Sequence, residues 1–281
     1  MPAVTGFVGL GNIGRPMASR LARARDDLVV FDVAAEPVAE MVGAGAKAAD
    51  SVSELAGLVD VLCVMVRDDN QVREVVGEAL GAARDGLTIA IHSTVAPDTP
   101  ADLADTAARH GVRIVDAPVS GGAMGAADGT LAIMAGGTAD AFAACRPVLA
   151  DMAGLVVHAG PIGAGTRMKL ARNLLHFVAF TAATEAQRLA EAAGLDLVAL
   201  GAVVRHTDAI TGGPGAIMHR ATTRPIDRGD FWHGVFDHVR TLGEKDLAFA
   251  IALADELGVD VPLARQAIGR LAAGLGLEET G

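Results

Sequence analysis

A glycine-rich loop near the start of the chain has the residue types of a phosphate-binding turn. Its sequence, Gly9-Leu10-Gly11-Asn12-Ile13-Gly14, fits the pattern G-x-G-x-x-G between an apolar stretch and a segment with helical spacing. Gly9 would permit a tight turn, Gly11 would let the backbone approach a pyrophosphate, and Gly14 would let helix and strand pack closely. The N-terminus of the following helix would add N–H groups and partial positive charge. The loop predicts dinucleotide binding, with a purely structural glycine turn as the alternative.

An acidic residue, Asp32, follows the loop at the distance that a dinucleotide site requires. It ends a second apolar stretch, 18 positions after Gly14. A carboxylate at this place accepts hydrogen bonds from a ribose hydroxyl and repels a 2′-phosphate. Residues 33–35, Val-Ala-Ala, supply no arginine for a 2′-phosphate. We therefore expect NAD rather than NADP; the alternative is that Asp32 merely caps the next helix.

Two polar side chains that could handle a proton lie four residues apart in the middle of the chain. Lys169 and Asn173 fall in a segment with helical composition, so they would project from one face of a helix. Oxidation of an alcohol needs a base for the hydroxyl proton while hydride leaves for a nicotinamide. A lysine can act as that base where desolvation and a nearby cationic ring lower its pKa. From these residues alone, an exposed structural lysine is the more ordinary interpretation.

A serine followed by two glycines provides a third candidate site. Ser120-Gly121-Gly122 follows an apolar stretch and would expose consecutive backbone N–H groups beside a hydroxyl. Such an arrangement suits a carboxylate. A simple turn is the alternative.

Other chemistries lack their usual patterns. The eight histidines include no His-x-x-x-His pair, and His233 and His238 are five apart, which aligns them poorly on a helix face. We expect no metal site. No G-x-S-x-G nucleophile turn is present.

The composition limits the partners of the chain. Its formal net charge of −11 has the wrong sign for binding a phosphate backbone. Only 3% of the residues are aromatic, so the chain has few side chains on which nucleic-acid bases could stack. No apolar segment reaches the length of about 20 residues that spans a bilayer, and no signal peptide precedes the first strand. Two cysteines, Cys63 and Cys145, make no disulfide framework. We expect a cytoplasmic protein with reduced thiols that binds neither nucleic acid nor membrane.

Short apolar strands alternate with helical segments through the first half of the 281 residues. A capping box, Ser51-Val52-Ser53-Glu54, opens one of the helices, and Arg146-Pro147 predicts a helix end. Strands are expected at Val4–Gly9, Leu28–Asp32, Val59–Val66, Leu87–His92, Val112–Pro118, Gly129–Gly137 and Leu155–His158. Helices are expected at Gly14–Ala24 and Pro37–Val42, and from about Asn70 and Pro97. This alternation predicts a parallel sheet covered on both faces.

The pattern changes after Gly163. Residues 164–193 contain no proline and predict a helix of roughly 45 Å. Further helices are expected at Leu197–His206, Gly215–Ala221, Gly234–Leu257 and Pro262–Ala273, without strands. The predicted fold is therefore α/β, a Rossmann-type doubly wound parallel sheet over 1–162, followed by an all-helical substrate and dimerisation domain over 163–281 that begins with the long helix.

Four ordered blocks make the chain resemble the β-hydroxyacid dehydrogenase family, which includes enzymes that oxidise 3-hydroxyisobutyrate. The blocks are residues 6–18 with the glycine loop, residues 116–131 (Asp-Ala-Pro-Val-Ser-Gly-Gly onward), residues 163–173 with Lys169, and Lys245-Asp246-Leu247. They extend over almost the whole chain. The family fold, a nucleotide-binding domain joined by a long helix to a helical domain, agrees with the pattern above.

The resemblance implies roles for particular residues. Lys169 would be the acid/base catalyst, Asn173 would orient the substrate or the lysine, and Ser120 to Gly122 would hold the substrate carboxylate. The cofactor would be contacted by the glycine loop, Asp32 and four further residues: Val66, Arg67, Thr94 and Lys245. The implied partners are a small carboxylate substrate and copies of the same chain, as a homodimer or homotetramer.

The chain departs from the family pattern in three places. Val66-Arg67 replaces a Leu-Pro pair, Leu174 replaces a polar residue, and the C-terminus lacks an Asp-x-Ser ending. The first departure concerns the cofactor, whose backbone contacts can survive the change. The other two leave the choice of substrate more open than the reaction. Alternatives on the same scaffold are an imine, ketone or semialdehyde reductase and a non-catalytic dinucleotide-binding module; retention of Lys169 disfavours the imine and ketone reductases and the module.

Overall fold

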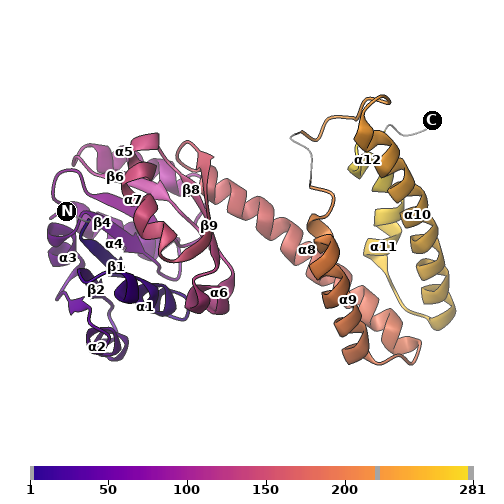
Figure 1. The fold of residues 1–281 in the computed structure, drawn as a ribbon, viewed down its shortest axis with the longest axis horizontal. Coiled ribbons are helices and arrows are strands. Elements are labelled where there is room, and N and C mark those ends of the chain that lie inside the picture. Colours follow the sequence, from indigo (N-terminus) through magenta and orange to yellow (C-terminus); the bar gives the residue numbers. More distant parts are fainter. Residues whose placement is uncertain (1–2, 219–221, 278–281) are drawn as a thin grey trace. The chain divides into compact units, whose positions relative to one another are not determined.

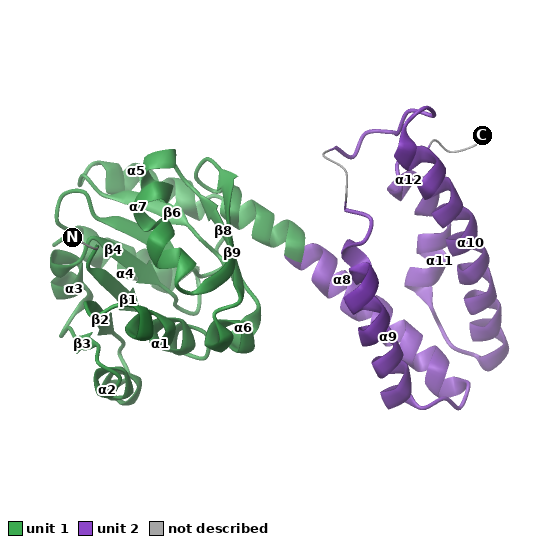
Figure 2. Cartoon of the chain, in the orientation of Figure 1, with its two compact units in different colours: residues 1–172 green, residues 173–281 purple. Residues whose placement is uncertain are grey.

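The computed structural model describes residues 3–218 and 222–277. The chain divides into two compact units, residues 1–172 and residues 173–281, which Figure 2 shows in different colours. The predicted domain boundary at 162/163 lies at the start of the long helix, whereas this division falls within that helix. The boundary stays a prediction.

A nine-stranded sheet forms the centre of the first unit (Figure 1). The strands are β1 (Thr5–Val8), β2 (Leu28–Phe31), β3 (Lys47–Ala48), β4 (Val61–Val64), β5 (Thr88–Ile91), β6 (Arg113–Asp116), β7 (Val119–Ser120), β8 (Leu131–Gly136) and β9 (Ala153–Gly160). Six of them run parallel in the order β3-β2-β1-β4-β5-β6; β8 is antiparallel to β6 and β7 and parallel to β9. The predicted doubly wound sheet is thus confirmed.

The strand register brings the carboxyl ends of the parallel strands level. Val8 pairs with both Phe31 and Val64, Val64 pairs with Ile91, and Ile91 pairs with Asp116. The loops that follow these strands therefore leave from one edge of the sheet, where ligands bind in open α/β folds.

Alternation along the strands supplies a core on each face of the sheet. Phe7 and Cys63 point into one hydrophobic cluster, while Val8 and Leu62 point into the other. The covering helices are α1 (Gly14–Ala24), α2 (Ala35–Gly43), α6 (Gly122–Asp128) and α7 (Ala139–Ala150) on the first face, and α3 (Val52–Leu58), α4 (Asp69–Leu80) and α5 (Thr99–Ala108) on the second.

The predicted capping box forms at the start of α3. The Ser51 hydroxyl accepts from the Glu54 N–H at 3.0 Å, and the Glu54 carboxylate accepts from the Asp50 N–H at 2.6 Å. The returning bond thus reaches one residue further back than the usual box.

The second unit consists of helices and the loops between them, with no strand among its described residues. Its elements are α8 (Ala164–Ala192, which begins in the first unit), α9 (Leu197–Thr211), a 3₁₀ turn at Gly213–Gly215, α10 (Phe231–Leu257), α11 (Pro262–Ile268) and α12 (Leu271–Gly274). Buried Glu185 of α8 accepts from the N–H groups of Leu263 and Ala264 and so caps α11. No helix among the described residues is long and apolar enough to span a membrane.

Helix α9 ends at Thr211 rather than His206, and α10 begins at Phe231 rather than Gly234. Three further helix predictions are wrong. Helix α7 continues through Pro147, because Val148 and Leu149 beyond it are buried in the core. Residues 215–218 form the end of a 3₁₀ turn and a turn rather than an α-helix, and residues 219–221 of that prediction lie outside the described residues. The helix predicted at Pro262–Ala273 is two helices, since Gly269 and Arg270 interrupt it. The C-terminal residues 278–281 also lie outside the described part.

Candidate functional site

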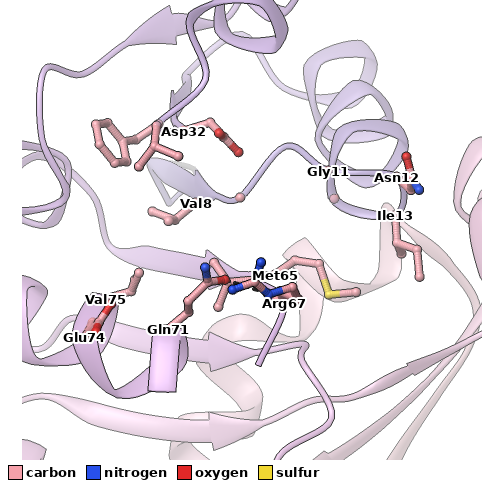
Figure 3. Close-up of a pocket in the computed structure, with 15 residues that line it drawn as sticks. Val8, Gly11, Asn12, Ile13, Asp32, Met65, Arg67, Gln71, Glu74 and Val75 are labelled. Atoms are coloured by element: carbon pink, nitrogen blue, oxygen red, sulfur yellow. Dashed lines mark hydrogen bonds between the residues drawn. The ribbon is translucent and has the colours of Figure 1, made fainter. Parts of the chain in front are cut away.

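A cavity of about 550 Å³ opens at the carboxyl edge of the sheet (Figure 3). This volume lies in the range of small-molecule sites. The loops after β1, β2 and β4 and the first turns of α1 and α4 line it, with Val8, Gly9, Gly11, Asn12, Ile13, Gly14, Phe31, Asp32, Val33, Met65, Val66, Arg67, Gln71, Glu74 and Val75. The structure thus brings the glycine loop, Asp32, Val66 and Arg67 to one cavity.

The three glycines of the loop have the environments that their predicted roles require. Gly9 has φ +94°, and a Cβ there would stand 2.1 Å from the Met65 carbonyl oxygen. A Cβ on Gly14 would stand 2.0 Å from the Gly9 carbonyl oxygen, so the helix packs directly on the turn. A Cβ on Gly11 would meet nothing within 4 Å, so its backbone faces open space. No side chain caps α1, and a phosphate can bind at its N-terminus. These residues fit a dinucleotide.

Asp32 is held in a fixed orientation beside the loop. One carboxylate oxygen accepts from the Leu10 N–H at 2.6 Å and the other accepts from the Ala34 N–H at 2.8 Å. The first bond ties the carboxylate to the glycine loop, which a mere cap of the next helix would not need. Neighbouring Val33 is 95% exposed and provides no cation beside the carboxylate.

The opposite wall of the cavity depends on a serine that sequence reasoning missed. The buried Ser93 hydroxyl donates to the Val66 carbonyl at 2.7 Å and accepts from the Val66 N–H at 2.9 Å. Gln71 accepts from the exposed Arg67 N–H at 3.0 Å. The family resemblance had already implied Val66 and Arg67 of this wall, but the only sequence signal for Ser93 was the Ser-Thr pair after β5. Thr94, the member of that pair that was predicted, is exposed and does not line the cavity.

The Ser120 segment forms a tight turn at the start of α6. Ser120 ends β7 and is half-buried, while Gly121 and Gly122 are exposed with φ +133° and +64°. Both values favour glycine. A Cβ on Gly122 would meet nothing within 4 Å, so its backbone is open to a ligand.

Lys169 is unusual among lysines because it is buried. Only 8% of the residue is exposed, on the second turn of α8. Burial lowers the pKa of Lys169, and the positive charge of Arg172 lowers it further. A buried lysine with a lowered pKa is suited to proton transfer.

Two of the predicted site residues lie in the second unit. Asn173 is half-buried on α8, one turn after Lys169. Lys245 is exposed on α10, with its ammonium 3.2 Å from the Asp246 carboxylate. Among the described residues, no group of three or more His, Cys, Asp or Glu could hold a metal ion.

Two family profiles match the chain. The profile described as the NAD binding domain of 6-phosphogluconate dehydrogenase matches residues 4–160. The profile described as NAD-binding of NADP-dependent 3-hydroxyisobutyrate dehydrogenase matches residues 163–278.

Similar proteins carry related descriptions. An uncharacterized oxidoreductase of Mycobacterium tuberculosis is 53% identical, over 97% of this chain and 93% of its own. A 3-hydroxyisobutyrate dehydrogenase of Pseudomonas aeruginosa is 35% identical, over 92% and 87%. A 2-(hydroxymethyl)glutarate dehydrogenase of Eubacterium barkeri is 32% identical, over 98% and 91%.

Solved structures extend the similarity to the fold. An oxidoreductase from Mycobacterium avium superposes with a TM-score of 0.96 at 50% identity, over 99% of this chain and 100% of its own. The 3-hydroxyisobutyrate dehydrogenase of M. tuberculosis, solved with L-serine, gives 0.69 at 31% identity, over 99% and 97%. An imine reductase from Myxococcus stipitatus gives 0.77 at 18% identity, over 100% and 97%, and shares the fold.

Proposed function

The chain belongs to the β-hydroxyacid dehydrogenase family and is an NAD(P)-dependent dehydrogenase of CH–OH donors, and from this premise we propose that it oxidises a short β-hydroxy acid to its semialdehyde, or runs the reverse reaction, with Lys169 as acid/base. The observation that carries the proposal is the burial of Lys169 together with its lowered pKa. A surface lysine would stay charged and could not accept a proton near neutral pH.

Different residues of this chain have different roles in the proposed reaction. A bound nicotinamide dinucleotide supplies the hydride acceptor or donor. The neutral Lys169 amine takes the hydroxyl proton during oxidation, and its ammonium returns a proton to the oxygen during reduction. The N–H groups at Ser120, Gly121 and Gly122 hold the substrate carboxylate. Asn173, one turn after Lys169 on the same helix, orients substrate or lysine.

The cofactor is NAD in preference to NADP. Asp32 places two carboxylate oxygens beside the cavity, where they accept from a ribose diol and repel a 2′-phosphate. Val33, Ala34 and Ala35 supply no cation to offset that repulsion.

The names of the relatives narrow the substrate class. 3-Hydroxyisobutyrate, 2-(hydroxymethyl)glutarate and L-serine all have the form HOCH₂–CH(R)–COO⁻. They differ only in R, a methyl, a propionate or an ammonium group. We propose that this chain takes a member of the same class, with 3-hydroxyisobutyrate as the reference compound.

The chain acts as a homodimer or homotetramer in the cytoplasm, without nucleic acid or membrane. Apolar side chains on α8 and α9, such as Phe177, Phe180 and Val203, are more than half exposed and fit a second copy. Cys63 and Cys145 are both free and buried, which suits a reducing compartment.

The test is the absorbance of reduced nicotinamide with NAD and NADP across 3-hydroxyisobutyrate, 3-hydroxypropionate, L-serine, glycerate and 4-hydroxybutyrate. We expect turnover with NAD on compounds of the form HOCH₂–CH(R)–COO⁻, and its loss in Lys169→Ala but not in Lys47→Ala, a control at an exposed strand residue. Full turnover by Lys169→Ala would refute the lysine assignment. Turnover confined to imines or ketones would favour a reductase, and tight NAD binding without turnover would favour a binding module.

A further inference from the structure

A buried carboxylate, Asp116, lies at the start of the helix that carries Lys169. Asp116 is the last residue of β6 and is 0% exposed. One of its oxygens accepts from the Gly163 N–H at 2.7 Å, and the other accepts from the Thr166 N–H at 2.6 Å. Both oxygens therefore hold backbone N–H groups at the beginning of α8, which would otherwise lack intrahelical partners.

The same helix start is pressed against the sheet, backbone to backbone. A Cβ on Gly136 of β8 would stand 2.7 Å from the Gly165 nitrogen, and a Cβ on Gly165 would stand 2.2 Å from the Met134 carbonyl oxygen. No side chain separates the helix from the strands at this point. The first turn of α8 therefore has one position, set by backbone contact and by the two bonds to Asp116.

The position of Lys169 depends on the position of this turn. It lies three residues after Thr166 and four after Gly165, and all three residues are buried on one face of the helix. At about 1.5 Å per residue, its Cα is roughly 4.5 Å further along the axis than that of Thr166. A shift of the first turn would move the lysine with it.

Burial also affects the protonation of Asp116. Burial raises its pKa, against the opposing effect of the N–H groups of Thr166 and Gly163. A carboxyl whose folded-state pKa is raised contributes stability at low pH that is lost as the pH rises through that value. Burial thus disfavours the ionised form of Asp116 relative to that of an exposed aspartate.

We infer that Asp116 is a positioning residue for the reaction, which fixes the first turn of α8 and thereby the location and burial of the Lys169 amine. This inference rests on the proposed function of Lys169. Asp116 itself touches the helix backbone and is separate from the residues that line the dinucleotide cavity.

The test combines kinetics with chemical labelling of Lys169. In Asp116→Asn, an NH₂ group replaces one carboxylate oxygen and would face a backbone N–H that needs an acceptor. Asp116→Ser keeps one oxygen as an acceptor and introduces no NH₂ group. The matched control is Asp98→Asn, since Asp98 precedes α5 and makes no side-chain cap bond. Reductive methylation across a pH series, read by mass spectrometry, gives the accessibility and the titration midpoint of Lys169, with exposed Lys47 as internal reference.

We expect kcat to fall about 100-fold in Asp116→Asn, as a displacement of about 1 Å can cost, and by less in Asp116→Ser. The dissociation constant for NAD should not change. Labelling of Lys169 should become faster and its midpoint should move toward that of Lys47, while Asp98→Asn matches the wild type. Unchanged labelling in both Asp116 variants would overturn the inference, whatever happens to kcat.

The two proposals can fail separately. If the labelling changes as expected but Lys169→Ala keeps full turnover, Asp116 positions the lysine and the proposed catalytic role is wrong. If Asp116→Asn does not fold, Asp116→Ser carries the same labelling test.

Discussion

At the scale of single residues, Asp32 determines the expected choice between cofactors. Asp32→Ser removes the charge that repels a 2′-phosphate and replaces the carboxylate acceptor for a ribose diol by a shorter, neutral hydroxyl. We expect the ratio of kcat/KM for NAD over NADP to fall at least tenfold, equivalent to about 1.4 kcal/mol. Steady-state kinetics with both cofactors measure the ratio, and Asp98→Ser is the control. An unchanged ratio would mean that Asp32 does not set the preference.

Lys169 makes a prediction about pH. Because burial and Arg172 lower its pKa, the neutral amine becomes available below the usual lysine range. In the oxidation direction kcat/KM should rise with pH and level off above that pKa, and in the reduction direction it should fall across the same range. An arginine cannot lose its proton, so Lys169→Arg should reduce oxidation by about 100-fold or more. A rate independent of pH in both directions would contradict the assignment.

At the scale of elements, the contact between α8 and the sheet should be intolerant of a single methyl group. Gly165→Ala places a Cβ 2.2 Å from the Met134 carbonyl oxygen. We expect it to destabilise the protein by about 1–3 kcal/mol. The matched control is Gly77→Ala at an exposed position of α4, where a Cβ meets nothing within 4 Å. That change should stabilise the protein by about 0.5–1 kcal/mol. Thermal unfolding of both variants checks the pair, and equal effects would refute the close packing.

A comparison of the elements with the sequence shows which features could be predicted and which could not. Seven of the nine strands, α1 and the glycine loop could be predicted because short apolar runs, helical spacing and glycine positions are local signals. The two-residue strands β3 and β7 were not predicted, since they are too short to give such a signal. Ser93 could not, since it acts on Val66, 27 residues away. The cap by Asp116 joins residues 47 and 50 positions apart. The helix end predicted at Pro147 was wrong because burial of the residues after it outweighs the local tendency of proline to break a helix.

At the scale of the whole molecule, the helical unit leaves large apolar side chains exposed. Its buried cluster among the described residues contains only four residues, Ile226, Phe236, Leu275 and Leu277. Phe180 and Val203 remain 56% and 60% exposed. We expect Phe180→Asp or Val203→Asp to convert the oligomer to smaller species in light scattering, whereas Leu58→Asp, on α3 of the first unit, leaves the mass unchanged. A monomeric mass for the wild-type protein at micromolar concentration would refute the prediction of an oligomer.

The level row of strand ends in the sheet has a consequence for engineering. Phe31, Val8, Val64, Ile91 and Asp116 are paired in register, so every loop at that edge starts from a fixed line. A one-residue insertion within any of these strands would move its loop and turn its side chains to the wrong face. The turns at the other edge, such as Gly81 to Gly86 before β5, carry no such constraint. They are places where a peptide tag or a reporter can be inserted while the edge that lines the cavity keeps its geometry.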